Sequence, residues 1–599
     1  MKKTILFLTL LASTAFAQQP TPDARFAGLD TLFARVLNEW KCAGFAVAVV
    51  EKDKIVYAKG FGYADIDSKR PVTEHTQFAA GSCTKPFTCA ALGLLRAENK
   101  IDFNHSVREY LPQLSFYNEE MNKNITVRDL MCHRTGLPRH DQAWALFSTH
   151  SVDTLLKRVQ YLEPNYGLRE KWQYNNFMFA AQGKMVENLS GQSYRAFVRE
   201  RIFQPLGMKD VTFSVDSMTL YNDRSLCYAV SEDDKIVPLD YFNLDVMSAV
   251  GGINTSVSEM AKWVMLWANN GIYKGKRILP AEYVREAISS QMVVRDAAPS
   301  ASNPSLHFEN YGLGWFLSSY RGHYRVEHGG NISGFSTNTC FFPTDGVGIV
   351  VFCNQAVSRV PSVVRNILAD RMLGLPYKDW QSYLYTSDMA AKNAAKSAKS
   401  QMASLTKTNV KPAHPADEYE GYFQHKGYGT FEIVNRNDSL FAVFPLQQWY
   451  LRPYGHDVFD ALPVDKSGKV ASEGSVQRIV FNQNTEAEIA SASIAFEPEL
   501  IHPLEFTWSP KVKKLPKVVL QRYVGEYNLN GMAMKVGLNA NEILYLSLPN
   551  QPTRELEALG KGKFRLKGLN GYSISFSQDA KEFLLTQPNG IFKALKKKA

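Results

Sequence analysis

The sequence has few cysteines, and they show no arrangement that is typical of a metal site or a redox motif. The 599 residues include seven cysteines, an odd number, and no two of them form a C-x-x-C pair. No disulfide framework is therefore evident, and we expect most of these side chains to be small buried apolar groups. The twelve histidines include no H-E-x-x-H pair. We therefore expect neither a metal ion nor another cofactor.

Long apolar runs are absent beyond the start of the chain. No later segment approaches the ~18 uninterrupted apolar residues that a membrane-spanning helix needs. At the start, a short basic stretch precedes an apolar run over residues 5–11 and the small-x-small site Ala15-Phe16-Ala17. This pattern predicts a signal peptide over residues 1–17, and the alternative is a buried first helix. No cysteine follows to accept a lipid, so we expect a periplasmic or secreted protein without an integral membrane segment after cleavage.

No long block of one charge dominates the sequence. Lysine and arginine number 68 against 58 acidic residues, a formal net charge of +10, and only Lys596-Lys597-Lys598 forms a cluster. We interpret this distribution as a solvated surface, which could favour association with an anionic cell envelope. Because no basic patch is interleaved with aromatic residues, we expect no nucleic-acid partner.

The length of the chain exceeds what one hydrophobic core supports. A mixed pattern fills residues 24–374, with apolar strand-like runs at residues 45–50 and 347–352 near its ends and helical patterns between them. Ends that supply strands and a middle that supplies helices predict an α+β domain, an antiparallel sheet flanked by helices.

A change of composition follows this domain. Residues 375–412 are typical of a helical or flexible linker. Beyond it, the stretch that begins at Tyr419 (YEGYF) resembles the one that begins at Tyr523 (YVGEY), and Leu440 and Leu544 keep the same separation. Short alternating runs between turn signals predict two duplicated antiparallel β-barrel-like modules, residues 413–510 and 511–599.

The clearest chemical signal is a serine, Ser82, three residues before Lys85 at a predicted helix start. One helical turn places both side chains on the same face, so the lysine amine can accept the hydroxyl proton as Ser82 attacks a carbonyl. Pro86 fits a first helical turn, and apolar residues continue after it at helical spacing. The same spacing of Ser404 and Lys407 in the linker shows that the pattern alone is weak. The alternative is a solvated polar first turn.

A second signal is Tyr174-Asn175-Asn176, which precedes another helical pattern. The Tyr174 phenol could relay protons between Ser82, Lys85 and a leaving group, and the Asn176 amide could bind a substrate carbonyl. The alternative is a buried aromatic residue beside a capping asparagine.

A third signal is His328-Gly329-Gly330-Asn331, between two strand-like stretches. Glycine there would let a substrate approach the backbone closely. Backbone N–H groups on such a strand, together with that of Ser82, could stabilise an oxyanion. The alternative is a glycine-rich turn with an exposed histidine.

In this order, the three signals resemble the serine β-lactamase and penicillin-binding-protein superfamily, particularly its class C β-lactamase, D-aminopeptidase and esterase branch. The resemblance covers about residues 24–374. Five stretches carry it: Ser82-Cys83-Thr84-Lys85 (S-x-x-K), Tyr174-Asn175-Asn176 (Y-x-N), His328-Gly329-Gly330 (H-x-G in place of K-T-G), His133-Arg134-Thr135-Gly136-Leu137-Pro138 (H-x-S-G-L-P, with threonine for serine) and Pro205-Leu206-Gly207-Met208 (P-L-G-M).

The resemblance implies specific roles for these residues. The catalytic residues would be Ser82 as the acylated nucleophile, with Lys85 and Tyr174 sharing the acid–base work. The substrate would be bound by four further residues: Asn176, His328, Gly330 and Asn331. The amides of Ser82 and Asn331 would form the oxyanion hole. The β modules resemble the lipocalin-like C-terminal domains of some relatives.

One departure from the superfamily pattern concerns His328, which stands where penicillin-recognising members have a lysine. A mostly neutral imidazole is a poorer anchor for a substrate carboxylate. We therefore expect an exported serine hydrolase that acts through an acyl-enzyme on a small-molecule or peptide amide or ester, as a peptidase or esterase. The alternatives are a β-lactamase or D,D-peptidase, or a non-catalytic envelope receptor that binds peptidoglycan or β-lactams.

Overall fold

The computed structural model describes residues 23–300, 304–404, 411–465, 467–470, 477–549, 551–569, 572–587 and 589–597. The chain divides into two compact units, one of Met1–Asp141 with Thr149–Ser404 and one of Gln142–Ser148 with Leu405–Ala599. The predicted signal peptide and residues 405–410 of the predicted linker lie outside the described residues.

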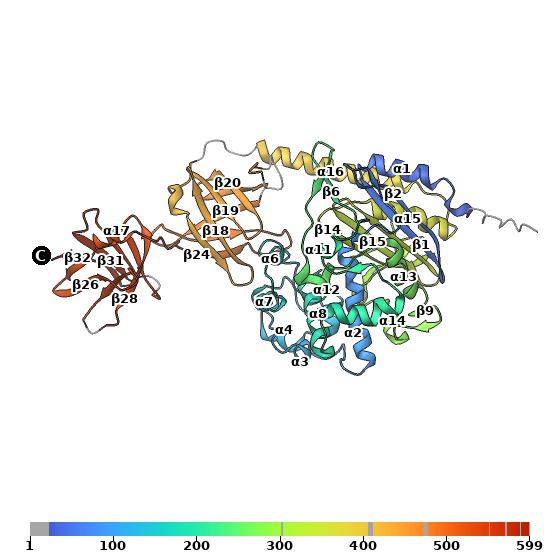
Figure 1. Ribbon diagram of the computed structural model, residues 1–599, viewed down its shortest axis with the longest axis horizontal. Helices are drawn as coiled ribbons and strands as arrows, with labels where there is room; N and C mark the ends of the chain where they lie inside the picture. Colours follow the sequence, from blue (N-terminus) through green and yellow to red (C-terminus); the bar gives the residue numbers. More distant parts are fainter. Residues whose placement is uncertain are drawn as a thin grey trace, which may run out of the picture. The chain divides into compact units, whose positions relative to one another are not determined.

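The first unit is built on a nine-stranded antiparallel sheet (Figure 1). The two apolar runs expected to form strands pair at its centre, where Val47 lies opposite Val351. The sequence correctly predicts an antiparallel sheet that takes strands from both ends of this region. In spatial order its strands are β11 (Met292–Val293), β12 (Glu309–Tyr311), β13 (Phe316–Tyr320), β14 (His323–Ile332), β15 (Phe335–Phe342), β16 (Val347–Cys353), β1 (Gly44–Glu51), β2 (Lys54–Asp65) and β3 (Arg70–Pro71).

Helices cover both faces of the sheet, which explains why its central strands are apolar throughout rather than alternating. On one face, Phe45, Val47 and Val49 of β1 share a core with residues of α1 (Leu29–Glu39) and α15 (Val360–Met372). On the opposite face, α13 (Val257–Ala268) packs against β1 and β16. Gly348 of β16 makes room there, because a Cβ at this position would lie 2.3 Å from a methyl group of Val264.

The remaining helices of this unit include those that carry the candidate site. Strand β4 (Phe78–Ala79) leads into the 3₁₀ turn η2 (Gly81–Thr84), which continues directly into α2. The predicted linker is mostly helical, since α16 runs through it. The helices are α1 (Leu29–Glu39), α2 (Lys85–Ala97), α3 (Val107–Tyr110), α4 (Glu119–Asn124), α5 (Val127–Met131), α7 (Val152–Arg158), α8 (Phe177–Ser190), α9 (Tyr194–Val198), α10 (Gln204–Leu206), α11 (Val215–Met218), α12 (Ser248–Gly251), α13 (Val257–Ala268), α14 (Ala281–Ala287), α15 (Val360–Met372) and α16 (Trp380–Ser404).

The second unit contains two closed eight-stranded antiparallel barrels, orange and red in Figure 1. The repeated residues occupy corresponding places, with Leu440 on the third strand of the first barrel and Leu544 on the third strand of the second. The first barrel consists of β17 (Gly421–His425), β18 (Gly429–Arg436), β19 (Ser439–Val443), β20 (Gln448–Gly455), β21 (Val458–Val464), β22 (Gln477–Gln483), β23 (Ile489–Ile494) and β24 (Leu504–Ser509). The second consists of β25 (Gly525–Leu529), β26 (Met532–Leu538), β27 (Leu544–Ser547), β28 (Arg554–Gly560), β29 (Lys563–Leu566), β30 (Ser573–Phe576), β31 (Glu582–Gln587) and β32 (Gly590–Lys596).

A short segment far from the barrels in sequence also belongs to the second unit. Residues Gln142–Ser148, which include helix α6 (Gln142–Ala145), cluster with the barrels rather than with the residues on either side of them. No sequence pattern predicted this excursion of the chain.

All seven cysteines are buried free thiols, as expected for small apolar side chains. The closest pair is Cys42 and Cys353, with 3.3 Å between the Sγ atoms. Within the described part of the chain, no helix combines the length and the apolar character needed to cross a membrane.

Candidate active site

The structure brings Ser82 and Lys85 together at the junction of η2 and α2. Lys85 Nζ lies 3.0 Å from Ser82 Oγ and donates a hydrogen bond to the carbonyl of Val250 at 3.1 Å. The Lys85 side chain is fully buried (0% exposed), whereas Ser82 is partly exposed. The interpretation as a solvated polar first turn is therefore wrong.

The environment of Lys85 favours its neutral form. Burial lowers the pKa of the Lys85 amine well below its usual value, and the nearby charge of Arg139 lowers it further. A neutral amine can keep one N–H on the Val250 carbonyl and turn its lone pair toward the Ser82 hydroxyl. This is the geometry of a general base that accepts the serine proton.

The phenol of Tyr174 is the second group on Ser82. Its OH donates to Ser82 Oγ at 2.8 Å. Burial raises the pKa of Tyr174 well above its ordinary value, so the phenol keeps its proton near neutral pH. Two groups with opposite tasks thus meet at one oxygen, since Lys85 can accept a proton and Tyr174 can supply one.

The turn of residues 133–138 packs against Tyr174 and is hydrogen-bonded to the next residue, Asn175. His133 Nδ1 accepts a hydrogen bond from the Asn175 backbone N–H at 3.1 Å, and Asn175 Nδ2 donates to the Pro138 carbonyl at 2.6 Å. The His133 ring packs on the Tyr174 ring with centroids 4.3 Å apart. Burial lowers the pKa of His133 well below its usual value, so the ring is neutral and its proton is on Nε2. The turn therefore contributes to the site by orienting Tyr174.

Asn176 stands at the start of α8, but its side chain does not cap the helix. Asn175 does so instead, because its Oδ1 accepts from the backbone N–H of Met178 at 3.3 Å. Asn176 Nδ2 donates to Asp141 Oδ1 at 2.9 Å, and its own Oδ1 is buried with no hydrogen-bond partner among the described residues. The capping-asparagine alternative thus applies to the neighbouring residue.

His328 is neither exposed nor in a turn. It lies within β14, is 1% exposed, and accepts a hydrogen bond on Nε2 from the Tyr311 hydroxyl at 2.9 Å. Its Nδ1 donates to the Gly329 carbonyl at 2.7 Å. This pairing is consistent with the neutral ring, which is favoured because burial together with the neighbouring Lys85 lowers the pKa of His328 to about 3.

Gly330 allows β14 to pass close to η2. A Cβ there would lie 2.1 Å from the Ala80 carbonyl oxygen and 3.0 Å from the Ser82 backbone nitrogen. A Cβ on Gly81, whose φ is +54°, would lie 3.2 Å from the Asn331 backbone nitrogen. The chain itself fills this space, so the missing side chain serves the packing of two segments rather than the close approach of a substrate. The amides of Ser82 and Asn331 lie on these two facing segments.

Sequence reasoning missed two charged residues beside the site, Arg139 and Asp141. The Arg139 guanidinium lies over the Tyr174 ring, 4.8 Å from its centroid, and pairs with Asp141 at 2.6 Å. Both residues directly follow the recognised turn of residues 133–138, which is the signal that could have drawn attention to them. The Val250 carbonyl had no such signal, because any residue supplies a carbonyl.

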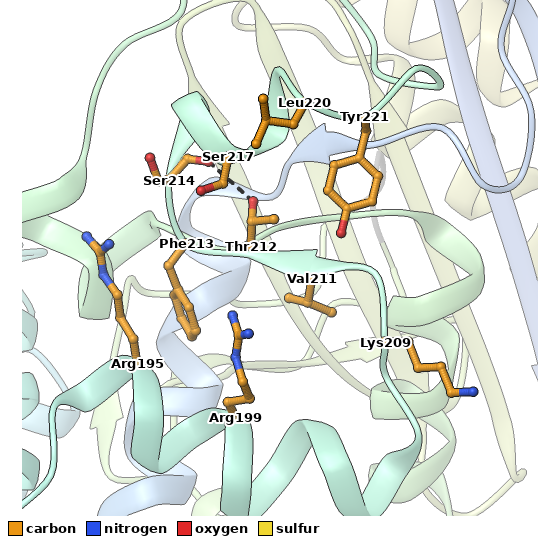
Figure 2. Close-up of a pocket in the computed structure, with 10 residues that line it drawn as sticks. All are labelled: Arg195, Arg199, Lys209, Val211, Thr212, Phe213, Ser214, Ser217, Leu220 and Tyr221. Atoms are coloured by element: carbon orange, nitrogen blue, oxygen red, sulfur yellow. Dashed lines mark hydrogen bonds between the residues drawn. The ribbon is translucent and has the colours of Figure 1, made fainter.

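A separate pocket of about 450 Å³ lies elsewhere in the first unit (Figure 2). Arg195, Arg199 and Lys209 contribute to its wall, and none of the predicted catalytic residues does. Arg195 Nε donates to Ser248 Oγ at 3.1 Å, at the start of α12. The same short helix presents the Val250 carbonyl to Lys85, so this pocket adjoins an element that supports the site. Among the described residues, no cluster of three or more His, Cys, Asp or Glu side chains is suited to a metal ion.

A partly exposed serine that meets a buried lysine and a protonated tyrosine, on a helix beside an antiparallel sheet, defines the class of serine hydrolases with an S-x-x-K centre. The chain belongs to the beta-lactamase family, whose model matches residues 29–371, more than half of its length. It is a serine hydrolase of that family. A second model, a domain of unknown function (DUF3471), matches residues 405–507 and thus the first barrel.

Named relatives are distant. The chain is 28% identical over 435 residues to "Unguisins hydrolase ungD'" of Aspergillus campestris, covering 68% of this chain and 78% of that protein. It is 23% identical over 342 residues to "Protein flp" of Staphylococcus aureus, covering 57% of this chain and 65% of that one. The octameric penicillin-binding protein homologue from Pyrococcus abyssi is similar in structure, with a TM-score of 0.53 and 19% identity over 80% of this chain and 99% of that one. At this identity the last likeness concerns the fold alone.

Proposed function

We propose that this chain hydrolyses an amide or ester through an acyl-enzyme on Ser82. The observation that carries the proposal is the convergence of Lys85 Nζ and the Tyr174 hydroxyl on Ser82 Oγ, at 3.0 and 2.8 Å. Neither a structural core nor a binding surface requires a base and an acid on one partly exposed hydroxyl.

The proton movements follow from the protonation states. The neutral Lys85 amine accepts the Ser82 proton as Oγ bonds to the substrate carbonyl carbon. The resulting oxyanion is stabilised by the amides of Ser82 and Asn331. Tyr174 donates its proton to the leaving nitrogen or oxygen as the scissile bond breaks, and the Lys85 ammonium returns a proton to the phenolate. Water then attacks the ester on Ser82, with the same two groups working in reverse.

The neutral His328 bears on the substrate class. A buried imidazole with a pKa near 3 offers no cation to a substrate carboxylate at neutral pH. We therefore favour peptidase or esterase chemistry over β-lactam hydrolysis. The name of the Aspergillus relative, a hydrolase, supports hydrolysis as the outcome. We also propose export to the periplasm or medium, which N-terminal sequencing of the mature protein from its host would test by finding Gln18 first.

The first test is covalent labelling. A fluorophosphonate probe should add one adduct to the peptide containing Ser82, and Ser82→Ala should abolish it. Cys83→Ala is the matched control. The Cys83 thiol is buried and hydrogen-bonded to the His328 carbonyl at 3.2 Å, and burial raises its pKa to about 11, so it is a poor nucleophile. An adduct found on Cys83 would contradict the serine mechanism.

The second test is turnover. Para-nitrophenyl esters, D-amino-acid amides and a chromogenic cephalosporin separate esterase, peptidase and β-lactamase activities. We expect turnover of esters or amides and little turnover of the cephalosporin. A stable adduct without turnover of any substrate would instead favour a non-catalytic receptor.

A further inference from the structure

In the segment Gln142–Ser148, the side chain of Phe147 packs among aromatic residues of the first barrel. Phe147 is 1% exposed. Its ring contacts four aromatic rings, with centroids 5.5–6.1 Å away. These rings belong to Tyr428, Phe444, Phe496 and Phe506.

The barrel is shaped to accept this ring. Gly429 begins β18, and a Cβ there would lie 2.9 Å from Cδ1 of Phe147. At the other end of the segment, the Gln142 backbone N–H donates to Glu497 Oε1 at 3.0 Å. The barrel thus contacts both ends of the segment. The absence of a side chain at Gly429 leaves room for Phe147, and the Glu497 carboxylate accepts a hydrogen bond from Gln142.

The residues immediately before this segment lie beside the catalytic groups. Asp141 accepts a hydrogen bond from Asn176 with one carboxylate oxygen and pairs with Arg139 through the other. Arg139 in turn lies over the ring of Tyr174. One peptide bond joins Asp141 to Gln142, so the chain runs from the catalytic cluster directly into the anchored segment.

We propose that Phe147 is a positioning residue for catalysis: its anchorage in the first barrel fixes the end of the segment that carries Arg139 and Asp141, and thereby holds this charged pair against Tyr174 and Asn176. The inference rests on the proposed acylation of Ser82, and it links Phe147 to that reaction through the backbone of the chain alone. Phe147 acts only through Arg139 and Asp141.

The charges around Lys85 provide a readout that loss of stability alone would not move. Arg139 lowers the pKa of Lys85, while Asp141 and the thiols of Cys83 and Cys89 raise it to a smaller extent. Two neutral imidazoles also lie in this cluster, because burial lowers the pKa of both His133 and His328. If Arg139 moves away, the pKa of Lys85 rises. The acid limb of the pH–rate profile, where the acylation rate rises as Lys85 loses its proton, then moves to higher pH.

The experiment compares Phe147→Ala with Phe564→Ala in the full-length protein. Phe564 is equally buried but belongs to the core of the second barrel, so its variant controls for a damaged barrel. We measure the rate of Ser82 labelling by the fluorophosphonate from pH 5 to 10, and the hydrogen–deuterium exchange of the peptide spanning residues 133–141. Phe147→Ala should move the acid limb upward by about half a unit to one unit, a three- to tenfold slower reaction on that limb. The same variant should speed exchange in the peptide, whereas Phe564→Ala should change neither. Arg139→Gln should reproduce the shift of the limb.

The outcomes separate this inference from the proposed function. Absence of Ser82 labelling in the unmodified protein would contradict the proposed function. Labelling with the same acid limb and the same exchange in Phe147→Ala would overturn the positioning role and leave the function standing. If Phe147→Ala does not fold, Phe147→Leu keeps an apolar anchor of smaller size, and we expect a smaller shift in the same direction. A folded Phe147→Leu with unchanged limb and exchange would also overturn the proposal.

Discussion

At the scale of single residues, burial decides which form each titratable group takes around Ser82. Lys85 and His328 are both held neutral because water cannot solvate their cations, and Tyr174 is held neutral because water cannot solvate its anion. These three groups are therefore a base (Lys85), an acid (Tyr174) and an imidazole that does not titrate near neutral pH (His328), and none of the three carries a charge there. Arg139, which is partly exposed, is the cation that remains beside it.

This arrangement predicts the pH dependence of acylation. The rate of Ser82 labelling should rise with pH through one ionisation that lies well below the ordinary value for lysine of ~10.4, because only the neutral amine is a base. Lys85→Arg should lose nearly all activity, since a guanidinium stays protonated. His328→Gln should keep the same acid limb, because a group with a pKa near 3 does not titrate in this range. A limb that disappears in His328→Gln would assign the base to the histidine instead.

A stability measurement tests the same pKa. Between the folded pKa of Lys85 and ~10.4, the unfolded chain binds a proton at this residue that the folded chain does not bind. The contribution of Lys85 to the unfolding free energy of the native protein therefore rises with pH across this window, by at most about 1.4 kcal/mol per pH unit. Lys85→Met removes this dependence, so its stability relative to the native protein should fall steadily from pH 7 to pH 10. Melting curves at four pH values, with exposed Lys276→Met as the control, would check it, and parallel pH profiles would contradict a lowered pKa.

At the scale of elements, the site depends on the close packing of the turn η2 against strand β14. Thr337 Oγ1 on the next strand donates to the Ala80 carbonyl at 2.7 Å, which ties the sheet to the residue before the turn. Glu327 on β14 is paired with Arg365 of α15, and this buried pair secures the strand from the other side. The distance between Ser82 and the strand is therefore set by backbone packing.

Adjacent glycines on β14 offer a matched test of this packing. Gly330→Ala would place a methyl group 2.1 Å from the Ala80 oxygen, whereas the nearest atom to a Cβ at Gly329 is 3.4 Å away. We expect Gly330→Ala to destabilise the protein by about 1–3 kcal/mol through overpacking, and to slow Ser82 labelling as η2 and β14 separate. Gly329→Ala should retain both. Equal behaviour of the two variants in melting and labelling assays would show that the packing is not the determinant.

At the scale of the whole molecule, each barrel has its own aromatic or aliphatic interior. The second barrel closes around residues such as Tyr527, Phe564 and Phe583, which share a core with other barrel residues and with the segment that leads into the barrel, including helix α17 (Lys517–Gln521). The first barrel differs, because its interior includes Phe147 from the middle of the catalytic sequence.

This difference predicts unequal effects of shortening the chain. A chain ending at Pro510 retains the first barrel and should fold and label Ser82 at close to the native rate. A chain ending at Ser404 exposes Phe147, whose ring packs in the first barrel, and loss of the contacts of one buried phenylalanine is worth about 3–5 kcal/mol. We expect the shorter chain to aggregate or to melt at a lower temperature, as measured by light scattering and circular dichroism. A fully stable chain ending at Ser404 would show that the anchored segment is dispensable for folding.

Much of the fold could be predicted from the sequence, because its signals are local. The apolar runs at residues 45–50 and 347–352 have the length and composition of buried strands, and they pair as expected. The repeated tyrosine and leucine positions predicted two similar β modules, and both are closed barrels. The S-x-x-K spacing predicted that the Lys85 side chain lies beside that of Ser82, because three residues along a helix return a side chain to the same face.

The rest depends on contacts between segments that are distant in sequence. Asp141 follows a recognised turn, but only the fold turns it toward Asn176, and only the fold buries His328 against Tyr311. Phe147 carries no local pattern that assigns it to a barrel whose strands begin at residue 421.

The sequence by itself determined the family of this protein, its antiparallel sheet, its duplicated barrels and the residues proposed for catalysis, since each is written in short-range periodicity and spacing. The tertiary structure alone decided the protonation of Lys85 and His328, the neighbours of Tyr174 and the path of the segment Gln142–Ser148. Desolvation and packing between remote segments exist only once the chain has folded, so no local pattern could specify them.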